Sequence, residues 1–141
     1  MEAKANQAYC IKENYRPNLK PSSVNGYWNS TRVKMASAYQ YHVYEKAGQL
    51  LLRYRLNSVL DVGSGPGSKI KELIWPHCRD VVLVDHPMIA PLAKQTLPMA
   101  EVVGVDLEQA LVDLGKRFQL VICSDVIEHL TDPDPCVTFI R

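Results

Sequence analysis

The chain has 141 residues, of which 47% are hydrophobic and 22% charged, which excludes wholesale disorder and leaves room for a single domain. Sixteen basic and fifteen acidic residues give a net charge of +1, which excludes a global electrostatic footprint for nucleic acid. No apolar run reaches the ~20 residues of a membrane span, and residues 1–10 lack the apolar core of a signal peptide. The four cysteines form no CxxC pair, so we expect a cytoplasmic protein. The balanced charge and the absence of a membrane span lead us to expect neither a nucleic-acid nor a membrane partner.

The first 35 residues are polar and contain Pro17, Pro21 and Gly26, so we expect an N-terminal arm or loop there. Residues 36–55 differ, because apolar side chains recur at spacings of three and four, as on one face of an amphipathic helix. The residues of this predicted stripe are Ala36, Tyr39, Val43, Ala47, Leu50, Leu51 and Tyr54.

From residue 58 onward, four short runs rich in Val, Leu and Ile alternate with helical stretches. Runs that are apolar on both faces indicate a buried parallel sheet with helices above and below, and right-handed crossovers then give a Rossmann-like α/β fold. The expected strands are Ser58–Val62, Val81–Asp85, Glu101–Asp106 and Gln119–Ser124, and the expected helices are Ser68–Trp75, Met88–Leu97, Leu107–Leu114 and a last stretch from about Asp132 to the terminus.

Three glycines, Gly63, Gly65 and Gly67, follow the first expected strand. Ligands of open parallel sheets bind beyond the carboxyl ends of the strands, and glycines there let backbone N–H groups approach a ligand, although a tight turn alone would also require them. The dinucleotide fingerprint and the P-loop both need glycine where this chain has Ser68, and the P-loop needs Ser or Thr where it has Ile70. A nucleoside without a pyrophosphate fits better, and a nicotinamide oxidoreductase is disfavoured.

Acidic residues end the second and third expected strands at the same edge of the sheet. Asp85 lies 22 residues beyond Gly63, the placement of a carboxylate that accepts both ribose hydroxyls of a nucleoside. Asp106 could accept the amino group of an adenine. Either residue could instead cap the helix that follows it. His86 could lie against the base or be a solvated loop histidine.

Four motifs stand in the order and spacing of class I S-adenosylmethionine-dependent methyltransferases, and roughly residues 36–141 resemble the small-molecule enzymes of that family. The motifs are VLDVGSGPG (59–67), VVLVD (81–85), VVGVDLE (102–108) and LVICSDVIEHL (120–130). The resemblance implies S-adenosylmethionine as the cofactor. It implies that Asp61, Gly63, Ser64 and Gly65 border the methionine end, that Asp85 holds the ribose, that Asp106 and Leu107 meet the adenine, and that Ser124 closes the pocket.

The resemblance implies transfer of a methyl group to an oxygen or nitrogen atom of a small-molecule acceptor. A sulfonium methyl is already activated, so the protein mainly has to hold the acceptor in line with the S–CH3 bond. An acceptor that must lose a proton needs a base, for which His129 and, less favoured, Asp125 are the candidates near the end of the fourth strand.

The same stretch supports an alternative hypothesis of a metal site. Asp125, Glu128 and His129 share one face if the stretch is helical, and two carboxylates with an imidazole can bind a divalent cation. Some members of the resembled family use a similar run in this way, including ubiquinone-pathway O-methyltransferases and small-RNA terminal 2′-O-methyltransferases. Because EHL is also common in relatives without a metal, we expect no metal here.

Aromatic residues cluster before the first expected strand. Tyr39, Tyr41 and Tyr44, with Tyr27-Trp28, could form a lid over the cofactor. The alternative interpretation is that Tyr39 and Val43 belong to the core and that the others lie on the surface.

The chain departs from the resembled family in its length. The usual sheet has seven strands in the order 3-2-1-4-5-7-6, whereas this chain provides strands one to four, in the order 3-2-1-4. We therefore divide it into an arm, residues 1–35, and a partial cofactor-binding domain, residues 36–141. The alternative function is a non-catalytic S-adenosylmethionine-binding or interaction module, because half of the usual fold is missing.

The fourth expected strand, Gln119–Ser124, would be an apolar sheet edge open to pairing. Either the chain is a fragment, which its ending within a helix at residues 139–141 favours, or another chain covers the edge. A symmetric homodimer that pairs the two fourth strands is one solution.

Overall fold

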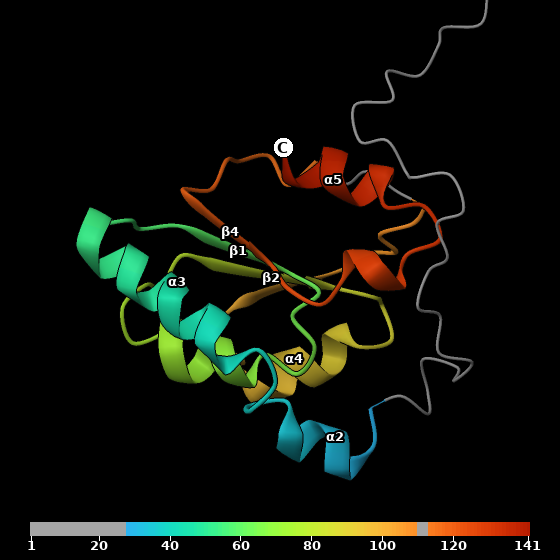
Figure 1. Ribbon diagram of the computed structural model, residues 1–141, viewed down its shortest axis with the longest axis horizontal. Coiled ribbons are helices and arrows are strands. Elements are labelled where there is room, and N and C mark those ends of the chain that lie inside the picture. The colour runs from blue at the N-terminus through green and yellow to red at the C-terminus, as the bar shows by residue number, and fades with distance from the viewer. Residues whose placement is uncertain (1–27, 110–112) are drawn as a thin grey trace, which may run out of the picture.

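The computed structural model describes residues 28–109 and 113–141, and its centre is a four-stranded parallel sheet in the order β3-β2-β1-β4 (Figure 1). This confirms the Rossmann-like α/β fold and the strand order expected from the sequence. Each strand begins and ends within two residues of its expected bounds. The strands are β1 (Val59–Val62), β2 (Val81–Asp85), β3 (Glu101–Gly104) and β4 (Leu120–Cys123).

Helices cover both faces of the sheet. Helices α3 and α4 lie on one face together with the π-helical turn η1, and α5 lies over the other (Figure 1). The helical elements are α2 (Ser30–Met35), α3 (Tyr41–Tyr54), η1 (Ile70–Ile74), α4 (Ala90–Thr96), the 3-10 turn η2 (Ile127–His129) and α5 (Asp134–Ile140).

Strand β1 shows why the strands of this sequence are apolar on both faces. Val59 packs in the core cluster on the α3 side, whereas Leu60 and Val62 pack in the cluster on the α5 side. None of these side chains is more than 3% exposed. Full burial of one such side chain stabilises the fold by about 1.5–3 kcal/mol. The alternation also turns Asp61 toward α3, where it contacts Tyr44.

Helix α3 begins at Tyr41 rather than at residue 36, because Gln40 adopts a left-handed conformation with φ of 52°. The face of α3 that packs on the sheet includes Tyr44, which is 2% exposed. Tyr39 and Tyr54 are 50% and 58% exposed. The predicted stripe is therefore wrong at these tyrosines, since apolar spacing alone does not show which hydroxyl finds a buried acceptor.

The expected arm is wrong for residues 30–35, which form α2 with the Asn29 side chain accepting a hydrogen bond from the Arg32 N–H at 2.9 Å. Residues 1–27 of that arm, including Tyr27 of the lid hypothesis, lie outside the described residues. The helix expected at 107–114 is also wrong where it is described, because residues 107–109 form a turn.

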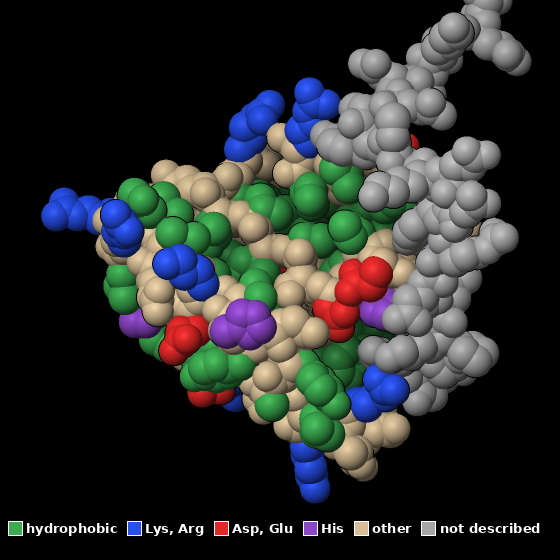
Figure 2. Space-filling view, viewed as in Figure 1, with side chains coloured by type: hydrophobic (Ala, Val, Ile, Leu, Met, Phe, Trp, Pro, Cys, Tyr) green, Lys and Arg blue, Asp and Glu red, His purple; other side chains and the backbone are tan. Residues whose placement is uncertain are grey.

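Strand β4 pairs with β1 along one edge, and no other strand of residues 28–109 and 113–141 pairs with its second edge. Val121 in the middle of β4 is 37% exposed. Hydrophobic side chains are visible on this face of the molecule over β4 (Figure 2). The expectation of an open apolar edge is therefore confirmed within the described part of the chain. No described helix is both long and apolar enough to cross a membrane.

Candidate functional site

A cavity of about 1050 Å³ opens at the carboxyl edge of the sheet. Its wall combines the residues that follow all four strands with residues of α2 and of the segment that joins α2 to α3. Every residue predicted for the cofactor or the catalytic base lines this cavity except Asp61. These residues are Gly63, Ser64, Gly65, Asp85, His86, Asp106, Leu107, Ser124, Asp125 and His129.

The glycine loop is held mainly by its own backbone. The N–H groups of Gly63 and Ser64 donate to the Val84 carbonyl at 2.8 and 3.2 Å. The N–H of Gly65 donates to Asp85 Oδ2 at 2.7 Å. Each of these three N–H groups therefore has an acceptor within the chain, which also agrees with the tight-turn interpretation of the glycines. The loop instead gives the cavity a wall with few side chains.

Two of the loop glycines are required by conformation and by close packing. Gly63 has φ of 74°, and a Cβ there would lie 2.2 Å from Val126 Cγ2. Gly65 has φ of 55°, and a Cβ there would lie 2.8 Å from Cζ2 of Trp28. The left-handed region is disfavoured for residues with a Cβ, so both positions favour glycine independently of any ligand.

We expect Gly63→Ala to lower the free energy of unfolding by about 1–2 kcal/mol more than Gly115→Ala does. Gly115 is the matched control, because its φ of 67° imposes a similar backbone strain but its added Cβ would meet nothing within 4 Å. The difference therefore isolates the contact with Val126. Urea unfolding of both variants measures it, and equal losses of stability would contradict the expectation.

Asp85 links the end of β2 to the glycine loop. Its two carboxylate oxygens accept hydrogen bonds from the N–H groups of Gly65 and His86, both at 2.7 Å. Burial raises the pKa of Asp85, and these two hydrogen bonds oppose the rise. Each oxygen has a second lone pair, so the carboxylate can hold the loop and still accept the hydroxyls of a ribose.

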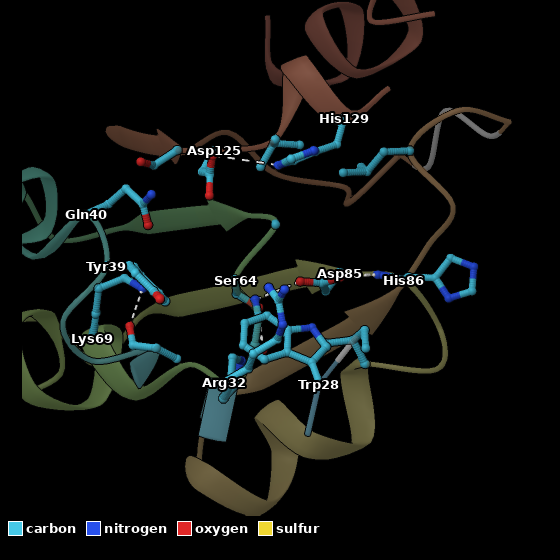
Figure 3. A pocket seen from close by; sticks show the side chains of 18 of the residues that line it. Trp28, Arg32, Tyr39, Gln40, Ser64, Lys69, Asp85, His86, Asp125 and His129 are labelled. Carbon is cyan, nitrogen blue, oxygen red and sulfur yellow. Dashed lines mark hydrogen bonds and ion pairs between the residues drawn. The ribbon is translucent and has the colours of Figure 1, made fainter. Parts of the chain in front are cut away.

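Asp106 lies at the matching position after β3 and accepts a hydrogen bond from the Glu108 N–H at 3.0 Å. Asp106 therefore stabilises the turn at residues 107–109 rather than capping a helix, and it also lines the cavity. Leu107 and Ser124 are half-buried in the cavity wall. The Nδ1 atom of His86 accepts the Met88 N–H at 3.3 Å, and its ring extends away from Asp85 (Figure 3).

Asp61 lies beneath the cavity, is fully buried and accepts a hydrogen bond from the Tyr44 hydroxyl, at 3.1 Å to Oδ1. Burial raises the pKa of Asp61 to about 8, while the Tyr44 hydrogen bond and the Lys69 ammonium oppose the rise. The Lys69 ammonium stands 4.8 Å from the centre of the Tyr44 ring and donates to the Ala36 carbonyl at 2.7 Å. This group joins β1, α3 and Lys69, the residue before η1, into one support.

A cluster of carboxylates and a histidine lies on the opposite wall. His129 Nε2 and Asp125 Oδ1 are 3.7 Å apart, with side chains 29% and 46% exposed. The potential metal-ligating atoms of Asp125, Glu128 and His129 all lie within 4.8 Å of one another. A hydrogen bond with Asp125 raises the pKa of Glu128, and burial adds to the rise. Acidic side chains beside a histidine are visible on the molecular surface near η2 (Figure 2).

The structure adds residues to the wall that the sequence motifs do not include. Trp28 and Arg32 lie across the cavity from Asp125 and His129 (Figure 3), and Lys69 also lines it. The aromatic pair at 27–28 pointed to Trp28, which the lid hypothesis already included. No local pattern marks the others, because they reach the cavity through the path of α2 and η1.

Comparisons with known proteins agree with this geometry. The profile of the family described as "Methyltransferase domain" matches residues 60–141, which is more than half of the chain. No curated protein sequence matches this chain.

Solved methyltransferases share the fold. The sugar N-methyltransferase KedS8 from Streptoalloteichus sp. ATCC 53650 has a TM-score of 0.63 at 20% identity, covering 89% of this chain and 54% of that one. CalS10, an amino pentose methyltransferase from Micromonospora echinaspora, has a TM-score of 0.60 at 19% identity, covering 81% and 50%. NodS, an N-methyltransferase from Bradyrhizobium japonicum WM9, has a TM-score of 0.58 at 18% identity, covering 80% and 63%.

At these identities the solved structures show likeness of fold, and this chain spans only 50–63% of their length. CalS10 contains bound S-adenosylmethionine, and NodS contains S-adenosyl-L-homocysteine. The family match, the sheet order and the cavity beyond the glycine loop lead to one assignment. The chain belongs to the methyltransferase-domain family of S-adenosylmethionine-dependent methyltransferases.

Proposed function

We propose that this chain binds S-adenosylmethionine in the described cavity and transfers its methyl group to an oxygen or nitrogen atom of a small molecule. The observation that carries the proposal is that one cavity joins the glycine loop, two carboxylates at neighbouring strand ends and an Asp125–His129 pair. Its volume of about 1050 Å³ lies near the upper end of common ligand sites, which leaves room for a nucleoside cofactor and a small acceptor together.

The proposed cofactor residues follow the edge of the sheet. Gly63, Ser64 and Gly65 border the amino-acid end of the cofactor, and Asp85 accepts the ribose hydroxyls. The half-buried Asp106 and Leu107 meet the adenine, with His86 at the margin of that end, and Ser124 closes the pocket after β4. Asp61 is fully buried against the Tyr44 hydroxyl, outside the cavity wall, and does not contact the cofactor. The donor set therefore fits a nucleoside with an amino-acid tail.

The cofactor supplies an activated methyl group, so the protein's own residues position the acceptor and hold its proton. His129 is the proposed base, because its half-exposed imidazole faces the cavity and its Nε2 lies 3.7 Å from Asp125. Asp125 would orient the imidazole and stabilise its protonated form. The same cluster with Glu128 is the alternative cation site. Turnover that is unchanged by EDTA would support the role of His129 as a base, and turnover that depends on added Mg²⁺ would support the metal.

The acceptor class to test first is a hydroxylated amine such as an amino sugar, since the fold is shared with sugar and amino pentose methyltransferases. Calorimetry with S-adenosylmethionine, S-adenosylhomocysteine and NAD tests the cofactor, and a panel of amino sugars and hydroxylated metabolites tests transfer. Binding of both sulfur nucleosides but not NAD, with methylation of one acceptor, is the expected result. Binding without transfer would favour the non-catalytic module, and NAD binding alone would overturn the proposal.

We also expect the chain to self-associate through β4, since the second edge of this strand is unpaired within the described residues and Val121 is 37% exposed. Sedimentation velocity should show a dimer at micromolar concentration. Val121→Lys would place a charge on the edge and shift the population toward monomer. A sharp monomer boundary for the unmodified chain would contradict this prediction. The domain boundary at residue 36 and a cytoplasmic location stay predictions.

A further inference from the structure

The cavity wall includes Trp28, Asn29, Thr31 and Arg32, which precede the region of the family match. The indole of Trp28 packs against the glycine loop, with Cζ2 and Cη2 at 2.8 and 3.0 Å from the position of a Cβ on Gly65. Trp28 is only half-buried, so part of its ring remains accessible from the cavity. A ligand seated on the glycine loop would therefore meet this indole.

Residues 28–39 place one side chain, that of Ala36, in the core. Helix α2 has no buried residue. The Lys69 ammonium holds the end of this segment by donating to the Ala36 carbonyl at 2.7 Å. Met35 and Tyr39 line the cavity while remaining 43% and 50% exposed. Apolar surface that faces a cavity and is left uncovered by the protein is available to a ligand.

The charge on this wall matches one part of the proposed cofactor. Arg32 and Lys69 are the basic side chains other than histidine in the cavity wall formed by the described residues. Of these two, Arg32 belongs to α2 and stands four residues after Trp28 in the sequence. Figure 3 shows Arg32 beside Trp28, on the side of the cavity where Ser64 lies. A guanidinium presents two parallel N–H donors, which is the geometry that binds a carboxylate most strongly.

We propose that Trp28 and Arg32 form a cofactor-binding wall contributed by the N-terminal segment, in which Trp28 covers the amino-acid end of the bound cofactor and Arg32 pairs with its carboxylate. This inference rests on the proposed function, because it takes the cofactor's amino-acid end to lie at the glycine loop. It extends the binding site to residues outside the family motifs and assigns a part of the ligand to each of the two side chains.

The first test uses tryptophan fluorescence. The chain has two tryptophans, and Trp75 does not line the cavity, so Trp75→Phe leaves Trp28 as the single reporter. Titration of this variant with S-adenosylhomocysteine should change the emission with the same Kd that calorimetry gives. Trp28→Phe, with Trp75 as its reporter, should show no such change. Emission from Trp28 that is unaffected by a ligand that calorimetry shows to bind would overturn the inference.

The second test compares S-adenosylhomocysteine with methylthioadenosine, which lacks the amino-acid end. Arg32→Met should weaken binding of S-adenosylhomocysteine by about tenfold or more and leave methylthioadenosine binding unchanged. Arg53→Met is the control, because Arg53 is an exposed arginine outside the cavity. An equal effect on both ligands, or no effect, would overturn the role of Arg32. If the unmodified chain binds neither ligand, the proposed function itself fails.

Discussion

Asp61→Asn is expected to remove a loss of stability that the unmodified chain shows as the pH rises from about 4 to about 8. The folded chain raises the pKa of Asp61 from 3.8 to about 8, chiefly by burial. Well below pH 4 the carboxyl is protonated in both the folded and the unfolded chain, so it makes no difference to folding. Above pH 8 the folded chain must bury a carboxylate that the unfolded chain exposes to water.

The sign follows from proton binding. Between these pH values the folded chain binds the Asp61 proton more tightly than the unfolded chain, so the free energy of unfolding falls as protons are removed. At pH 8–9 the buried Asp61 carboxylate lowers the free energy of unfolding by about 3–6 kcal/mol. Asn resembles the neutral carboxyl and can still accept the Tyr44 hydroxyl, so the variant keeps the contact without the titration.

The measurement is urea unfolding of both proteins at several pH values from 5.5 to 9. The difference in unfolding free energy, variant minus unmodified chain, should grow toward high pH. Asp113→Asn is the control, because Asp113 is exposed and its change should leave the pH dependence intact. Parallel curves for Asp61→Asn and the unmodified chain would show that Asp61 titrates like an ordinary aspartate.

Asp85→Ala is expected to weaken S-adenosylhomocysteine binding by about 2–4 kcal/mol, roughly 30- to 1000-fold. The change removes the proposed acceptor for the ribose hydroxyls. It also leaves the N–H groups of Gly65 and His86 without their acceptor at 2.7 Å, so the loop loses its link to β2. Both losses act at the same edge of the cavity.

Calorimetry measures the affinity, and two variants help to separate the causes. Asp113→Ala is the control of equal charge, since Asp113 accepts the Gly115 N–H at 2.7 Å but lies outside the cavity. Asp85→Asn keeps one oxygen acceptor and should lose less affinity than Asp85→Ala. Because burial raises the pKa of Asp85, affinity should also begin to fall at a higher pH than for an ordinary aspartate as the solution is acidified. An unchanged affinity in Asp85→Ala would remove this residue from the site.

The strands and the cofactor edge could be predicted because their signals are local. The run Val81–Asp85 is apolar on both faces and begins and ends where the structure has β2. Three glycines in five residues predict a tight turn with left-handed backbone positions, and Gly63 and Gly65 indeed have positive φ. Since parallel strands end at one edge, Asp85 at the end of β2 and Asp106 beyond β3 both line the cavity there.

Other features depend on contacts between distant residues. Tyr44 and Asp61 are separated by 17 positions in the sequence, and nothing local shows that the tyrosine hydroxyl is buried against that carboxyl. The left-handed turn at Gln40 also has no signal in residue type, although it decides where α3 begins. The apolar spacing of residues 36–55 therefore predicted a helix correctly but included the exposed Tyr39 and Tyr54.

The amino-acid sequence by itself determined the strand pattern, the glycine turn and the acids at the strand ends, because alternation, chain reversal and strand direction are properties of short segments. Only the tertiary structure decided that the loop's N–H groups are used internally, that Asp61 is withdrawn from the cavity, and that Trp28 and Arg32 complete its wall. Those outcomes depend on how α2, α3 and the sheet pack, and burial and hydrogen-bond partners are set by packing rather than by spacing along the chain.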